Sequence, residues 1–157
     1  MTKSILIGDD SQVFRRTTRG FIECHTPFRV CGEAIDGLDA VDKARKLRPD
    51  LIILDAAMPR LSGLQAARAI RRITSVPIIL FTLYAETVRA QDILSVGIDA
   101  VVPKAENLSL LGKHVSLLLN NVQQKQLVQG KRPEYLPSRP RSKVDVLNGT
   151  VPGGARR

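Results

Sequence analysis

The feature that most constrains the fold is a regular alternation of short apolar runs with longer segments in which apolar residues recur three and four positions apart. Five runs have the length of β-strands: residues 4–7, 29–34, 51–54, 78–81 and 100–102. Five segments have helical periodicity: residues 12–24, 38–47, 64–73, 86–96 and 108–124. The third and fourth runs are almost wholly apolar, which is typical of strands covered on both faces. The alternation therefore predicts an α/β fold, a doubly wound five-stranded parallel sheet with helices on both faces.

Residues that begin and end helices agree with these boundaries. Ser11 is a favourable N-cap for the first helix, and Gly97 is a favourable end for the fourth. Pro49 and Asp50 separate the second helix from the third strand.

Polar side chains stand where the predicted strands end. Asp9 and Asp10 follow the first strand and Asp55 follows the third, while Thr82 ends the fourth and Lys104 follows the fifth. Ligands of doubly wound sheets bind at the carboxyl ends of the strands, so the fold itself should bring these five side chains to one rim.

The five side chains suit phosphoryl transfer. A carboxylate can attack a phosphoryl group and form an acyl phosphate, provided that the repulsion between the two anions is neutralised. An all-oxygen cluster of carboxylates suits Mg²⁺. Lys104 can pair with one phosphoryl oxygen and Thr82 can donate a hydrogen bond to another. Taken singly, each residue is more simply a helix cap, a turn residue or a solvated charge. Five compatible residues at the ends of four strands favour the phosphoryl interpretation.

At this point the sequence resembles the receiver domain of two-component response regulators. The resemblance covers residues 1–120 and rests on matches that occur in the family's order and spacing: Asp9-Asp10, Asp55 through Met58-Pro59 to Gly63, Phe81-Thr82 and Pro103-Lys104. It implies a flavodoxin-like sheet with strand order 2-1-3-4-5.

The resemblance also implies a role for each site residue. Asp55 would be the phosphoacceptor and would receive the group from a histidine kinase or a phosphotransfer protein. Mg²⁺ would be held by Asp10 directly, by Asp9 through water, by Asp55 and by the backbone carbonyl of Ala57. Thr82 and Lys104 would sense the phosphoryl group and switch partner binding. Such a protein is not an enzyme in the ordinary sense, because it catalyses only its own phosphorylation and dephosphorylation.

The sequence departs from the family pattern around this site. Val101 occupies a position that usually carries an aromatic switch residue, and Ala105 replaces a proline that commonly follows the lysine through a cis bond. Leu83 and Tyr84 follow Thr82, where the family usually has a small residue first. We expect either that Leu83 or Tyr84 shields the acyl phosphate from water, or that both pack on the fourth helix.

Charge divides the chain into two parts. The chain carries 24 Lys and Arg against 15 Asp and Glu, a net charge of +9. Eight basic and two acidic residues fall in residues 125–157, which gives this segment +6 and leaves +3 on residues 1–124. We interpret 1–124 as the receiver domain and 125–157 as a basic, Pro- and Gly-rich tail without fixed structure. The tail is too short and too rich in proline for a folded DNA-reading module, so nucleic acid is an expected partner only of the tail.

Location and assembly can also be predicted. The sequence has neither a membrane span nor a signal peptide, and Cys24 and Cys31 read as reduced thiols, which together predict a cytoplasmic protein. The last helix has a core stripe at Leu111, Val115, Leu118 and Val122. Further leucines lie beyond it at 108, 110, 117 and 119. This surplus of apolar residues leads to the hypothesis of a homodimer through the fourth helix, fifth strand and fifth helix.

Three other interpretations stay open or are excluded. A receiver-like adaptor, uncoupled from phosphorylation, could bind protein or nucleic acid through its tail. A metal-dependent phosphohydrolase would need an aspartate two residues after the nucleophile, where this chain has Ala57. Arginines on the first helix (15, 16 and 19) and the third (68, 71 and 72) are either a docking surface or a solvated face.

Overall fold

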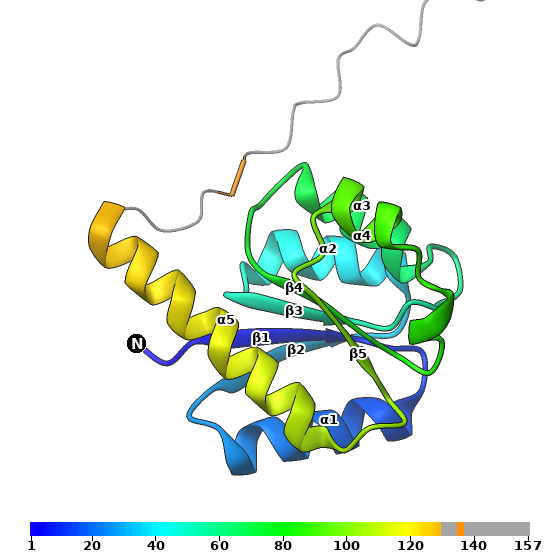
Figure 1. Ribbon diagram of the computed structural model, residues 1–157, viewed down its shortest axis with the longest axis horizontal. Coiled ribbons are helices and arrows are strands. Elements are labelled where there is room, and N and C mark those ends of the chain that lie inside the picture. Colours follow the sequence, from blue (N-terminus) through cyan, green and yellow to red (C-terminus); the bar gives the residue numbers. More distant parts are fainter. Residues whose placement is uncertain (130–134, 137–157) are drawn as a thin grey trace, which may run out of the picture.

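A five-stranded parallel sheet forms the centre of the protein, as the sequence predicts (Figure 1). The computed structural model describes residues 1–129 and 135–136. Its strands lie in the order β2-β1-β3-β4-β5. Their bounds are β1 Ser4–Gly8, β2 Arg29–Ala34, β3 Leu51–Leu54, β4 Ile78–Thr82 and β5 Ala100–Pro103, each within one residue of the expected range. The expected fold class and strand order are both confirmed.

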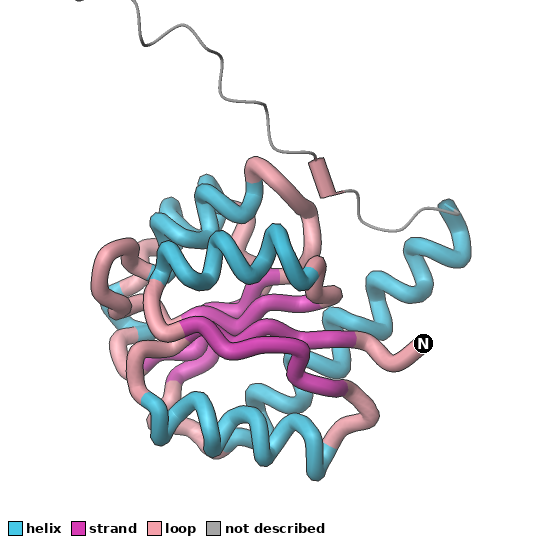
Figure 2. The backbone as a smooth tube through the Cα atoms, turned by 180° about the vertical axis from the view of Figure 1, so that it is seen from behind, coloured by secondary structure: helices cyan, strands magenta, loops and turns pink. Residues whose placement is uncertain are grey.

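Helices cover both faces of the sheet (Figures 1 and 2). One face carries α1 (Gln12–His25) and α5 (Leu108–Gln129), which pack on each other and enclose a hydrophobic cluster with the sheet. The other carries α2 (Gly37–Leu47), α3 (Gly63–Arg71) and α4 (Ala90–Val96) over a second cluster. The strands β1, β3 and β4 are buried throughout, because side chains on both of their faces meet helices.

Side-chain caps fix where helices near the site begin. The Ser11 hydroxyl accepts a hydrogen bond from the Phe14 N–H at 3.4 Å, and Asp36 caps α2 in the same way through Asp39. Ser62 and Gln65 form a reciprocal capping box at the start of α3. Such a cap contributes about 1 kcal/mol, so the loops that precede these helices are held in defined positions.

The expected fourth helix is wrong at its beginning. A 3-10 turn, η1 (Ala85–Thr87), comes first, and α4 begins only at Ala90. The Thr87 hydroxyl donates to the Tyr84 carbonyl at 2.8 Å, a local bond that competes with helix formation. Gly97 ends α4 in the left-handed conformation, with φ 76°, as predicted.

The fifth helix also differs from expectation. It continues to Gln129, five residues beyond the predicted end. Its buried stripe is Leu111, Val115 and Leu119 rather than the predicted stripe through Leu118 and Val122, both of which are only partly buried. Most of the predicted unstructured tail, residues 130–134 and 137–157, lies outside the described residues.

The arginines of α1 and α3 are largely committed to internal contacts. Arg15 and Arg19 both bind Glu33 of β2, at 3.2 and 2.5 Å. Arg71 donates to the Gly97 carbonyl and to Asp99. Arginines 15, 19 and 71 therefore serve mainly to join elements of the fold.

Within the described part of the chain, no helix combines the length and the apolarity that a membrane crossing requires.

Candidate functional site

Four adjacent strands deliver the predicted side chains to the carboxyl edge of the sheet. Asp9 follows β1, Asp55 follows β3, Thr82 is the last residue of β4, and Lys104 follows β5. Asp9, Asp55 and Thr82 are buried, and the Lys104 side chain is only 2% exposed. Parallel strands that end at one rim explain why residues up to 95 positions apart meet here.

The Lys104 ammonium lies between two carboxylates. Its Nζ is 2.5 Å from Asp9 Oδ2 and 3.4 Å from Asp55 Oδ2. The Ser11 N–H donates to the other Asp9 oxygen at 2.8 Å. Burial raises the pKa of Asp9, and the bonds from Lys104 and Ser11 offset only part of this effect. Burial thus disfavours the ionised form of Asp9, and an additional cation would stabilise that form.

Aromatic rings and backbone bonds hold the lysine in place. The Lys104 ammonium lies 4.0 Å from the centre of the Phe14 ring and 5.9 Å from that of Phe81, which are cation–π distances. The Lys104 N–H donates to the Thr82 carbonyl at 2.9 Å. Sequence reasoning missed Phe14. The available signal was its position in the first turn of the helix that follows the acidic pair, on the face turned to the site.

The acidic cluster fits a divalent cation. Carboxylate oxygens of Asp9, Asp10 and Asp55 lie within 4.8 Å of one another. Asp9 and Asp55 are buried, whereas Asp10 is exposed. Three carboxylates against one ammonium leave two negative charges at the site, and hard oxygen ligands are those that Mg²⁺ prefers. The Ala57 N–H donates to Asp55 Oδ1 at 3.4 Å, so the Ala57 backbone also lies at the site.

The loop after Asp55 is shaped by close backbone packing. A Cβ atom on Gly63 would stand 2.0 Å from the Asp55 carbonyl oxygen, so close approach is the reason for glycine at this position. Arg60, in the left-handed region with φ 68°, binds the buried Asp36 at 3.2 Å and ties the loop to the start of α2. The sequence analysis did not find the pairing of Arg60 with Asp36, because it joins residues 24 positions apart.

Similarity to a known protein family identifies the domain that carries this site. The family model of the response regulator receiver domain matches residues 5–116. The chain belongs to the response regulator receiver family. The receiver resemblance inferred from the sequence is thus confirmed.

Curated relatives are longer than this receiver. Residues of the chain are 39% identical over 101 positions to a protein-glutamate methylesterase/protein-glutamine glutaminase of Alkalilimnicola ehrlichii, covering 63% of the chain and 26% of that relative. A protein of the same name from Photobacterium profundum is 36% identical over 129 positions, covering 75% and 33%. The chain therefore spans about a quarter to a third of these relatives, and their esterase activity is not transferred to it.

Solved structures give the same result for the fold. The response regulator domain of CheB from Thermotoga maritima is 28% identical, with a TM-score of 0.63, covering 82% of this chain and 93% of that domain. The N-terminal domain of a response regulator/sensory box/GGDEF protein from Carboxydothermus hydrogenoformans is also 28% identical, with a TM-score of 0.70 and coverage of 78% and 98%.

The departures of this receiver from the family pattern have clear structural positions. Val101 is partly buried against the cluster under α2, α3 and α4. Leu83 and Tyr84 are 57% and 56% exposed, so neither is sequestered in the core. The Lys104–Ala105 peptide bond is trans, which resolves a point that the sequence left open.

Proposed function

We propose that this receiver accepts a phosphoryl group on Asp55 from a histidine kinase or a phosphotransfer protein. The observation that carries the proposal is the buried Lys104 ammonium between Asp9 and Asp55, with a third carboxylate, Asp10, in the same cluster. Burying the charges of Lys104, Asp9 and Asp55 is costly, and an adaptor uncoupled from phosphorylation has no use for them. A phosphoryl-accepting site needs both the ammonium and the carboxylates.

In the proposed reaction an Asp55 carboxylate oxygen attacks phosphorus. The O–P bond forms as the P–N bond to the donor imidazole breaks, and the imidazole nitrogen takes up a proton. Lys104 neutralises a phosphoryl oxygen beside Asp55. Mg²⁺, held by Asp9, Asp10, Asp55 and the Ala57 carbonyl, would supply the remaining positive charge for the incoming anion.

Thr82 is suited to sense the product. Its side chain is fully buried, and its Oγ1 accepts a hydrogen bond from the Tyr84 N–H at 3.1 Å. That bond uses an acceptor site and leaves the hydroxyl hydrogen to be donated to a phosphoryl oxygen. A shift of Thr82 would be passed directly to Tyr84 and the turn before α4, which is the proposed route to altered partner binding in the cytoplasm.

Intact-mass spectrometry after incubation with a small phosphodonor and Mg²⁺ tests the proposal. The wild type should gain one phosphoryl mass, and chelation of Mg²⁺ should prevent the gain. Asp55→Asn should gain none. Asp42→Asn, which removes a carboxylate that is 63% exposed on α2, should behave as the wild type. Equal labelling of wild type and Asp55→Asn would refute the assignment.

Self-association through α4, β5 and α5 is a further part of the proposal. Leu94 on α4 is 82% exposed and supports it. The leucine surplus of α5 gives less support than the sequence indicated: Leu119 is buried, while Leu108 and Leu110 pack partly against the core. Leu117 lines a groove with α1 instead.

Sedimentation velocity with and without a phosphoryl mimic measures this association. We expect a dimer that forms with the mimic and that Leu94→Ala weakens. A monomer under both conditions at high concentration would contradict this part.

A further inference from the structure

A groove lies at the edge of the sheet opposite to Asp55. It is bounded by the connection between α3 and β4 and by the connection between α4 and β5, at the amino ends of the strands. Its volume is about 510 Å³, and Leu136 is one of its lining residues, together with Arg71, Ile73, Thr74, Gly97 and Asp99. Leu136 belongs to the tail, so a segment distant in sequence forms one wall of the groove.

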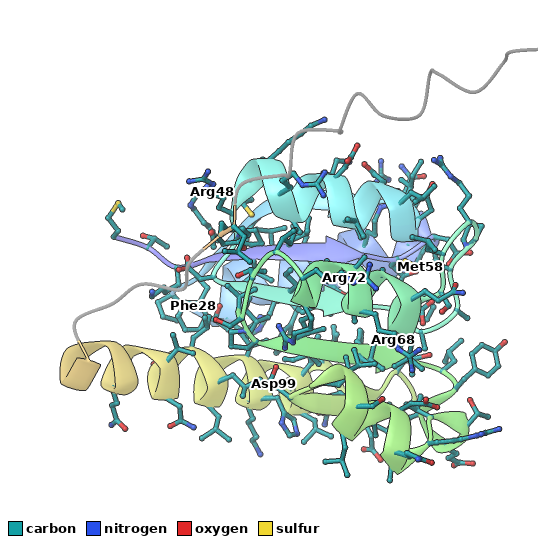
Figure 3. The ribbon with its side chains drawn as sticks, turned by 90° about the horizontal axis from the view of Figure 1, so that it is seen from above. Phe28, Arg48, Met58, Arg68, Arg72 and Asp99 are labelled. Carbon is teal, nitrogen blue, oxygen red and sulfur yellow. The ribbon has the colours of Figure 1, made fainter. Side chains whose placement is uncertain are left out.

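Tyr135 makes specific contacts beside this groove. Its hydroxyl donates to the Pro49 carbonyl at 2.8 Å. The ring is half-buried against the hydrophobic cluster under α2, α3 and α4, and the Arg48 guanidinium lies 6.0 Å from its centre. Figure 3 shows Arg48 next to the short segment of residues 135–136 and far from Met58, which follows the acidic site.

Leu136 adds a main-chain bond. Its N–H donates to the Ile73 carbonyl at 3.0 Å, at the point where α3 has ended and β4 has not yet begun. A phenol hydroxyl and a main-chain N–H thus satisfy carbonyls on two separate loops, Pro49 before β3 and Ile73 before β4. Hydrogen bonds together with side-chain burial are the means by which grooves recognise short peptides.

We propose that the surface beside this groove, which carries the Pro49 and Ile73 carbonyls, is a peptide-docking site whose ligand is the chain's own Tyr135–Leu136 segment. The docked pair is an anchor that sets where the rest of the basic tail leaves the receiver body. Residues 137–157 carry five basic residues and one acidic residue. Leu136, which precedes them in the sequence, lies at the edge of the sheet opposite to the acidic cluster. The proposal does not depend on phosphorylation of Asp55.

A peptide added in trans tests the docking. A labelled peptide of residues 131–139 is titrated into the full chain and into full chain carrying Tyr135→Ala and Leu136→Ala. We expect binding to the double variant at millimolar peptide or below, the order of the effective concentration of a short tether. Binding to the wild type should be at least tenfold weaker, because its own Tyr135–Leu136 segment already occupies the Pro49 and Ile73 carbonyls. A control peptide with both positions changed to alanine should bind neither chain. Equal binding to both chains, or none to the double variant, would overturn the proposal.

A second measurement does not require the double variant. The chain has two tyrosines, so Tyr84→Phe leaves Tyr135 as its only phenol. Burial raises the pKa of Tyr135 to about 12. After a rapid jump to about pH 11, tyrosinate absorbance read before the chain unfolds should be small, whereas a free phenol of pKa about 10 would be about 90% ionised. Immediate ionisation of Tyr135, to the extent measured for the same variant unfolded in urea, would overturn the proposal.

Two comparisons separate the alternatives. If the protection of the Tyr135 hydroxyl from ionisation falls on dilution, docking occurs between two copies of the chain. That result would overturn the intrachain assignment. Asp55→Asn should leave the absorbance result unchanged, so failure of the phosphorylation proposal and failure of this one are distinguishable.

Discussion

Gly63 shows how a single residue without a side chain shapes the acceptor loop. The Gly63 N–H donates to the Ala56 carbonyl at 2.9 Å, and a Cβ would collide with the backbone of Asp55. The atoms that the Cβ would meet belong to the backbone of Asp55 and Ala56, not to a flexible side chain that could move aside. The conformation of the loop that carries Asp55 therefore requires a residue without a Cβ atom at position 63.

Gly63→Ala should lower the free energy of unfolding by on the order of 3 kcal/mol, because backbone must move to admit the methyl group. Urea denaturation measures the change. Gly20→Ala is the matched control: a Cβ there meets nothing within 4 Å on α1, so it should stabilise the protein by about 0.5–1 kcal/mol. A neutral Gly63→Ala would show that the collision does not hold in solution.

Tyr84 carries a prediction about the lifetime of the acyl phosphate. Its side chain is more than half exposed and lies two residues after Thr82, so it does not fill the core, as the shielding hypothesis requires. Tyr84→Ala should shorten the half-life of the phosphorylated protein severalfold by admitting water. Leu38→Ala, an exposed change on α2 outside the proposed dimer interface, serves as the control. An unchanged half-life in Tyr84→Ala would remove the shielding hypothesis.

Among the elements, α1 and β2 are joined by one carboxylate. Glu33 binds both Arg15 and Arg19, and Arg15 also donates to the Asp9 carbonyl, which connects this ion pair to the site. Burial raises the pKa of Glu33, but the hydrogen bonds and charges of Arg19 and Arg15 outweigh it and lower the pKa below its ordinary value. Ionised Glu33 therefore stabilises the fold.

The lowered pKa gives this stabilisation a definite pH dependence. It is complete above the ordinary value of 4.5 and is lost as the pH falls through the folded pKa. Glu33→Gln should cost about 1 kcal/mol at neutral pH, since the pair is partly screened by solvent. The difference from wild type should vanish in acid. Urea midpoints across pH measure it, with Glu86→Gln on η1 as control. A deficit that persists at low pH would contradict the electrostatic explanation.

The elements were largely predictable, and the exceptions share a physical cause. Periodicity located all five strands and the bulk of each helix, because burial on a parallel sheet leaves a strong pattern. It failed at η1, where the Thr87 hydroxyl donates to the Tyr84 carbonyl, and on α5, where Leu119 rather than Leu118 faces the core. Strand ends predicted the positions of the site residues. Contacts between distant positions, such as Arg60 with Asp36, leave no local pattern.

The two proposed sites lie at opposite ends of the molecule. Asp9, Asp10 and Asp55 lie at the carboxyl edge of the sheet, and the groove that Leu136 lines lies at the amino edge. The net charge of the chain is +9, yet three aspartates of the receiver body gather where we propose that a cation and a phosphoryl group bind. The docking of Tyr135 was not predictable, because two residues in a proline-rich tail carry no periodicity.

The central claim is that Asp55, and not another carboxylate of the cluster, becomes the acyl phosphate. Borohydride reduces an aspartyl phosphate to homoserine, which peptide mass spectrometry can place in the sequence. After phosphodonor and Mg²⁺ treatment, we predict homoserine at position 55, with Asp9 and Asp10 intact. Homoserine at position 9 or 10, or none anywhere in the chain, would contradict the account.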